Sequence, residues 1–153
     1  LGRGLSHRLV ELDGQGAFVL VDAKSSSTGD SILITQKDIR EIQLAKAAIA
    51  AGIKVLIQRM GKKVEDVAML YLAGGFGSYI DKRNAARIGL IPQELQDRII
   101  PIGNGAGTGA MLSLLSAEEF VRAGYISDMA EYVELSSALE FQDEYVNAMY
   151  FSP

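Results

Sequence analysis

The chain has 153 residues, of which 48% are hydrophobic and 22% charged, a composition typical of one globular domain. Its net charge of -4 and the lack of any apolar run near the roughly 20 residues of a membrane-spanning helix predict a soluble, cytoplasmic protein with no nucleic-acid or membrane partner. Without cysteine, and with His7 as the one histidine, the sequence excludes structural zinc, iron-sulfur ligation and a thiol nucleophile within these residues.

The first predicted elements are two short β-strands, "FVLVDA" (18–23) and "SILI" (31–34). The turn-rich connector "KSSSTGD" between them favours a hairpin, which we expect at the edge of the sheet. The opening "LGRGLSHRLVELDGQG" does not begin with methionine. We therefore expect a fragment, in which residues 1–34 are the end of a preceding region.

A long helix is predicted next. Thr35 and Asp38 have the spacing of a capping box, in which two side chains satisfy free N–H groups at a helix start. Apolar residues then recur at intervals of three or four up to Met60, and Gly61 follows at a position where glycine commonly ends a helix. The pattern indicates a helix of about 25 residues.

The middle of the chain alternates strands with helices. The nearly continuous apolar run "VAMLYLA" (67–73) predicts a strand that is covered on both faces. After a glycine cluster, residues 79–88 are predicted as one helix, which "GLIP" ends. "RIIPI" (98–102) predicts a second buried strand, and it leads through "GNGAGTGAMLSLLS" into an apolar helix.

Three further elements are predicted before the C-terminus. Ser116 with Glu119 is expected to cap a helix, "YVEL" (132–135) predicts a last strand, and Ser137 with Glu140 is expected to cap a final helix through Met149. The alternation of strands and helices predicts an α/β fold with a mixed, partly parallel sheet flanked by helices.

The stretch "LYLAGGFGSYI" (70–80) is the first candidate for a ligand site. Gly74, Gly75 and Gly77 follow a predicted strand, where glycines let a ligand lie directly on the backbone. The spacing matches neither the G-x-G-x-x-G dinucleotide fingerprint nor a Walker A loop. A dinucleotide-dependent oxidoreductase is therefore disfavoured, but a tight turn that serves only helix-strand packing stays an equal alternative.

For two other features, the choice between a ligand site and a purely structural role also stays open. The cluster "GNGAGTGAM", which contains Asn104 and Gly105, suits either a ligand or the close approach of two helices. On the long helix, Gln43, Lys46 and Ala50 lie on one strip. Such a strip can bind a ribose or a base edge, or it can be an ordinary solvated face, which the residues alone favour.

Several separated blocks resemble one protein family. These blocks are "ITQKDIREIQLAKAAIAAGIKVLI", "YLAGGFGSYID", "ARIGLIP", "PIGNGAGTGAMLSLLS" and "VELSSALEFQDEYVNAMYF", which together extend from about residue 34 to residue 151. In this order they resemble the C-terminal part of the reductive activators of corrinoid proteins, the RACo-like proteins. That family belongs to the ASKHA superfamily of acetate and sugar kinases, heat-shock chaperones and actin.

The resemblance implies a fold and a function. Residues 35–153 are expected to form an actin-like, ribonuclease H-like ATPase subdomain on the adenosine side of a nucleotide cleft. The intact protein is expected to couple hydrolysis of ATP, bound with Mg²⁺, to reduction of a corrinoid protein from Co(II) to Co(I), through a 2Fe-2S cluster in another domain. The resemblance predicts these nucleotide-binding residues: Gly74, Gly75, Phe76, Gly77, Gln43, Lys46, Asn104 and Gly105.

The sequence also departs from the family. The ferredoxin-type domain, the other half of the ATPase core and the phosphate-binding hairpins are not found in these residues. Phosphoryl transfer needs a metal ion and cationic groups at the γ-phosphate, so we expect no catalytic residue, no metal ligand and no ATP hydrolysis by this chain alone. A non-catalytic actin-like module for protein interaction is the alternative function.

Overall fold

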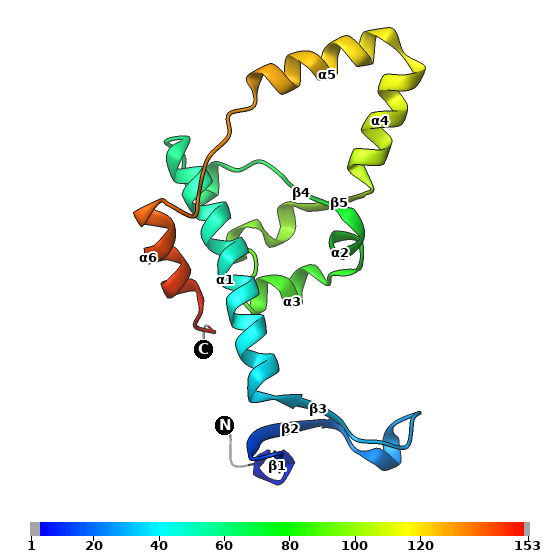
Figure 1. The fold of residues 1–153 in the computed structure, drawn as a ribbon, viewed down its shortest axis with the longest axis vertical. Helices are drawn as coiled ribbons and strands as arrows, with labels where there is room; N and C mark the ends of the chain where they lie inside the picture. Colours follow the sequence, from blue (N-terminus) through cyan, green and yellow to red (C-terminus); the bar gives the residue numbers. More distant parts are fainter. Residues whose placement is uncertain (1–3, 152–153) are drawn as a thin grey trace. The chain divides into compact units, whose positions relative to one another are not determined.

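The protein is described by a computed structural model, in which residues 4–151 are placed. The described residues form two compact units, which divide within the long helix α1 (Gln36–Arg59) between Ala45 and Lys46. Figure 1 shows the order of the elements along the chain. Within residues 4–151, no helix is both long and apolar enough to cross a membrane.

The first unit contains a three-stranded antiparallel sheet, in the order β1 (Leu9–Leu12), β2 (Gln15–Val21) and β3 (Ile32–Thr35). The predicted hairpin is confirmed as the pair β2–β3. Of the two strands, β3 lies at the expected edge of the sheet, whereas β2 is the central strand. The strand β1 was not predicted from the sequence. It joins β2 through Asp13 and Gly14, which both have positive φ, as two-residue hairpin turns require.

The helix α1 begins and ends as the sequence predicts. Thr35 Oγ1 accepts a hydrogen bond from the Asp38 N–H at 3.1 Å, and the Asp38 carboxylate accepts one from the Thr35 N–H at 2.8 Å. At the other end Gly61 has a φ of +64°, and the Lys62 N–H donates to the Ile57 carbonyl at 3.1 Å. These contacts satisfy backbone groups that a helix end leaves without partners.

Removing the N-terminal cap should weaken this helix. Thr35→Ala is expected to lower the free energy of unfolding by about 1 kcal/mol. The Thr35 hydrogen bonds also lower the pKa of Asp38 below its ordinary value of 3.8. A carboxyl whose pKa is lowered by folding stabilises the fold fully when the pH is above its ordinary pKa. This stabilisation is lost as the pH falls through the lowered pKa. Urea unfolding would measure the free energy of unfolding at about pH 7 and about pH 3. The decrease between these two pH values should be smaller in the variant than in the wild-type protein. Thr28→Ala, in an exposed loop, is the control, and an equal loss in both variants would contradict the capping role.

The second unit is built around a parallel pair of strands, β4 (Leu70–Ala73) and β5 (Ile99–Gly103). The connection between them contains the helices α2 (Gly74–Tyr79) and α3 (Lys82–Arg87) and a 3-10 helix (Gln93–Arg98). The core cluster lies on one side of the pair, and it consists of Ala85, Leu90, Ile91, Leu95 and Ile99, with Leu70, Leu72 and Ile80 among the residues packed against it.

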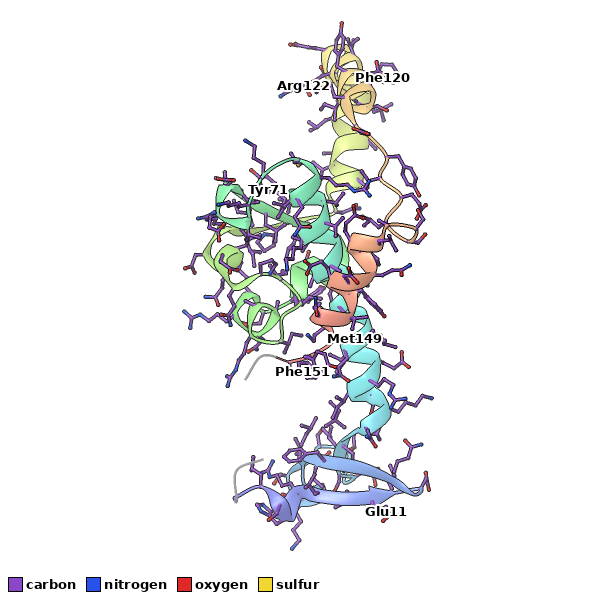
Figure 2. All side chains as sticks on the ribbon, turned by 90° about the vertical axis from the view of Figure 1, so that its left-hand side faces the viewer. Glu11, Tyr71, Phe120, Arg122, Met149 and Phe151 are labelled. Atoms are coloured by element: carbon purple, nitrogen blue, oxygen red, sulfur yellow. The ribbon has the colours of Figure 1, made fainter. Side chains whose placement is uncertain are left out.

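Two predictions in this region need correction. The β4 strand begins at Leu70 and is covered on one face only. Leu70 and Leu72 on that face are half-buried, whereas Tyr71 on the other face is 58% exposed (Figure 2). The predicted single helix 79–88 is wrong as well. Ile80 and Asp81 separate α2 from α3, because the Asp81 carboxylate accepts a hydrogen bond from the Asn84 N–H at 2.8 Å and caps α3.

Three helices complete the chain, α4 (Gly105–Leu115), α5 (Ala117–Met129) and α6 (Leu139–Ala148). The predicted cap of α5 is confirmed, since Ser116 Oγ accepts from the Glu119 N–H at 3.3 Å. The cap of α6 is wrong, because the helix follows Ala138 without a side-chain hydrogen bond.

The strand predicted at 132–135 is also absent from the described structure, where this segment has no regular secondary structure. The Glu134 carboxylate accepts hydrogen bonds from the Tyr132 hydroxyl at 2.5 Å and from the Ser136 N–H at 3.0 Å. The bonds from Ser136 and then from Tyr132 lower the pKa of Glu134 to about 2. Such local side-chain bonds compete with strand pairing.

Candidate nucleotide-binding site

The glycines after β4 form the first turn of α2, and each has a different environment. Gly74 has a φ of +84°, a conformation that side chains rarely adopt. A Cβ at Gly77 would lie 3.0 Å from the Leu72 Cβ and 3.1 Å from the Leu72 carbonyl carbon, so any larger residue there would force Leu72 or α2 to shift. A Cβ at Gly75 would meet nothing within 4 Å. The described fold therefore explains Gly74 and Gly77 but gives no reason for glycine at position 75.

A hollow of about 610 Å³ lies beside Gly75. Its lining consists of Gly75, Phe76, Tyr79, Ile80, Asp81, Asn84, Ala85 and Ile88. The rings of Phe76 and Tyr79 are largely exposed. Exposed rings offer faces on which a flat base can stack, while Asp81 and Asn84 carry polar groups at the same place. The wall is thus mainly apolar with a few polar groups, which is the usual character of a small-molecule site.

The two glycine clusters meet at one edge of the parallel pair. Ala73 and Gly103 are register partners at the ends of β4 and β5. A Cβ at Gly105 would lie 3.2 Å from Ile102 Cδ1 and 3.6 Å from Ala73 Cβ, so glycine lets α4 begin close to β4. The Asn104 side chain accepts a hydrogen bond from the Gly107 N–H at 3.0 Å and caps α4. Ligands of α/β proteins commonly bind at this carboxyl edge of parallel strands.

Lys46 has a different environment from the glycines. The residue is only 2% exposed, and its ammonium donates to the carbonyls of Ala148 at 2.5 Å and Tyr150 at 2.7 Å. The Nζ atom also lies 4.9 Å from the centre of the Phe151 ring. Burial lowers the pKa of the Lys46 ammonium. Gln43 lies three positions earlier on α1 and is half-buried.

The structure thus brings together some of the predicted site residues. Gly74 to Gly77 and the start of α4 lie at one edge, whereas the lining of the hollow beside Gly75, within the described residues, does not include Gln43 or Lys46. Sequence reasoning missed Tyr79 and Asn84 in that lining. A cap at Asp81 would have indicated Asn84, because Asn84 donates the capping N–H. Between residues 4 and 151 no cluster of three or more acidic or histidine side chains that could hold a metal ion is found.

Comparison with known proteins gives consistent results. Residues 3–153 match the family described as the C-terminal domain of RACo, the ASKHA domain. The chain is 42% identical over 142 residues to the corrinoid activation enzyme RamQ of Eubacterium limosum, covering 92% of this chain and 24% of that protein. It is 38% identical over 76 residues to the [Co(II) methylated amine-specific corrinoid protein] reductase of Methanosarcina barkeri, covering 50% of this chain and 14% of that protein.

A solved structure agrees with these relatives. The reductive activator for corrinoid, iron-sulfur protein superposes with a TM-score of 0.80 at 33% identity, covering 95% of this chain and 23% of that one. The chain spans less than a quarter of the length of each of the three proteins. The resemblance and the α/β fold predicted from the sequence are confirmed by these matches. The chain belongs to the family of RACo C-terminal domains, and its fold is that of an ASKHA domain.

Proposed function

We propose that this domain supplies the adenosine side of the ATP cleft in an ATP-dependent reductive activator of corrinoid proteins. Support comes from the family and from relatives that are named as a corrinoid activation enzyme and a corrinoid protein reductase. In the whole protein, one electron passes from a reduced iron-sulfur cluster, held outside this chain, to Co(II) of the corrinoid protein and yields Co(I). ATP hydrolysis drives this unfavourable transfer.

The single observation that carries the site assignment is the open space at Gly75. The fold does not require glycine there, whereas a ligand that lies on the backbone would. We assign adenosine to the surface formed by Gly74, Gly75, Phe76 and Gly77, with Asn104 and Gly105 at the adjoining end of α4. The residues assigned to the ribose and base edge from α1 are Gln43 and Lys46.

The domain is one partner in a larger ATPase core. We assign residues 35–153 to the nucleotide-binding subdomain and residues 1–34 to the end of a preceding region. The ligands of Mg²⁺ and of the phosphates are assigned to the other half of the core, which closes against this half when ATP is bound. This division gives the present chain a binding role and leaves phosphoryl transfer to the assembled cleft.

Titration of the chain with adenosine and with ATP tests this proposal. Both compounds are expected to bind saturably and with similar dissociation constants, because the phosphates gain little from this half alone. Calorimetry would measure the affinity, and phosphate release would measure hydrolysis, which is expected to be absent. Guanosine is the matched control. Binding of neither adenosine nor ATP would reject the assignment.

One observation favours a second function, a module for protein association without turnover. The helices α4 and α5 expose large apolar side chains, among them Leu114 at 86% and Phe120 at 68%. Figure 2 labels Phe120 on α5. Exposed apolar patches commonly mark interaction sites. Tight binding of a corrinoid protein to the chain, independent of adenosine and ATP, would favour this function over the first.

A further inference from the structure

The Lys46 ammonium is enclosed by the C-terminal end of the described chain. It donates to the carbonyls of Ala148 and Tyr150, and the Phe151 ring covers it on a further side. Ala148 is the last residue of α6, so the ammonium lies where the helix carries free carbonyl groups and partial negative charge. In the described part of the chain, no carboxylate pairs with this ammonium. Carbonyl dipoles and an aromatic face therefore compensate its charge.

The same helix is held to α1 by two further cations. Lys54 pairs with Glu144 at 2.6 Å, and Arg59 approaches Glu140 at 3.9 Å. Both pairs are at least partly exposed to solvent, and such pairs contribute little to stability, about 0–1 kcal/mol each. The attachment of α6 to α1 thus includes charged contacts along its length, of which the Lys46 contact is the buried one.

A hollow shows that the attachment is not close-packed throughout. It has a volume of about 370 Å³ and is lined by α1, by α6 and by residues between positions 86 and 94, with Ala50, Lys54, Gly89, Glu144 and Ala148 among its lining residues. None of the residues of α6 is buried. Elements with few buried contacts and many polar ones open at a low cost in free energy. The segment from residue 139 to residue 151 therefore has the character of a detachable latch.

We infer that this latch, residues 139–151, competes with the nucleotide for Lys46. An ammonium has three donors, and here two of them go to the carbonyls of Ala148 and Tyr150 while Phe151 covers a third direction. A ribose oxygen gains a hydrogen bond from Lys46 only when these carbonyls release it. The inference rests on the proposed contact between Lys46 and the nucleotide. The closed latch lowers nucleotide affinity, and by reciprocity bound nucleotide opens the latch.

The test uses the full-length protein and Mg-ADP. Glu144→Gln breaks the ion pair with Lys54 but leaves Lys46 and the α2 glycines intact. Because an exposed pair contributes up to about 1 kcal/mol, the variant is expected to bind Mg-ADP about two- to fivefold more tightly. Glu119→Gln is the matched control, since it breaks an exposed pair with Arg122 on α5. Hydrogen exchange of residues 139–151 is measured in parallel, and Mg-ADP is expected to accelerate it.

The possible results distinguish failure of the latch from failure of the proposed nucleotide-binding function on which it rests. Tighter binding by Glu144→Gln together with faster exchange in residues 139–151 supports the latch. If the wild-type protein binds Mg-ADP but exchange in this segment is unchanged or slower, the latch is wrong and the nucleotide site stands. If the wild-type protein does not bind Mg-ADP, the proposed function is wrong and the latch fails with it.

Discussion

Gly75→Val is expected to weaken binding of adenine nucleotides to the full-length protein about 10- to 100-fold without changing its fold. The affinity falls because the two methyl groups would occupy the surface on which adenosine is proposed to lie. Overpacking of a tight contact costs about 1–3 kcal/mol, which corresponds to a loss of affinity of about 5- to 150-fold and so includes the expected range. The fold tolerates the side chain, since a Cβ at position 75 meets nothing within 4 Å.

Calorimetry with Mg-ADP and thermal unfolding of the same samples would measure both parts of this expectation. The matched control is Gly124→Val, which places the same side chain on α5, again with nothing within 4 Å of the new Cβ. This control is expected to bind Mg-ADP like the wild-type protein. If Gly75→Val binds Mg-ADP with unchanged affinity, the assignment of adenosine to the surface after β4 is wrong.

Gly77→Ala, unlike Gly75→Val, is expected to act on stability, with a loss of about 1–3 kcal/mol in the free energy of unfolding. The new Cβ would lie 3.0 Å from the Leu72 Cβ, 3.1 Å from the Leu72 carbonyl carbon and 3.3 Å from its oxygen. Backbone atoms of a strand cannot move aside as a flexible side chain can, so α2 must shift away from β4. Any loss of nucleotide affinity would then follow from the displaced helix.

The free energy of unfolding in urea would measure this effect. Gly109→Ala is the control, because it lies within α4 with nothing within 4 Å of its new Cβ. There alanine should raise stability by about 0.5–1 kcal/mol, through its higher helix propensity. A gain of stability in Gly77→Ala would contradict the packing role of this glycine and leave both Gly75 and Gly77 to be explained by a ligand.

Local signals in the sequence were sufficient to predict those helices whose ends depend on contacts between residues a few positions apart. The capping box of Thr35 and Asp38 and the glycine at position 61 predict both ends of α1, because the hydrogen bonds involved join residues three to five positions apart. The parallel pair β4–β5 follows from two short apolar runs with helices between them. The segment 132–135 has the composition of a strand, but no neighbouring strand pairs with it in the described structure, and composition cannot reveal that.

The candidate site was predictable to a smaller extent. Glycines at the ends of two parallel strands must lie at one edge, so the meeting of Gly74 and Gly105 follows from topology. The environment of Lys46 does not, because its partners Ala148 and Tyr150 lie more than 100 positions away in the chain. The alanines around Lys46 at positions 45, 47 and 48 gave no clear signal of burial, since Ala47 is buried but Ala45 and Ala48 are exposed. Which group compensates such a charge depends on tertiary contacts.

The uncovered face of the β4–β5 pair has a practical consequence for work with this domain. Tyr71, Ile100 and Ile102 are all exposed, on strands that form a two-stranded sheet within residues 4–151. Two-stranded sheets are marginal by themselves, and exposed apolar strands invite pairing with other chains. Concentrated samples of the isolated domain should therefore self-associate, and its apparent melting temperature should depend on protein concentration. Affinities measured in dilute solution, with light scattering as a check, would avoid mistaking this association for an effect of the nucleotide.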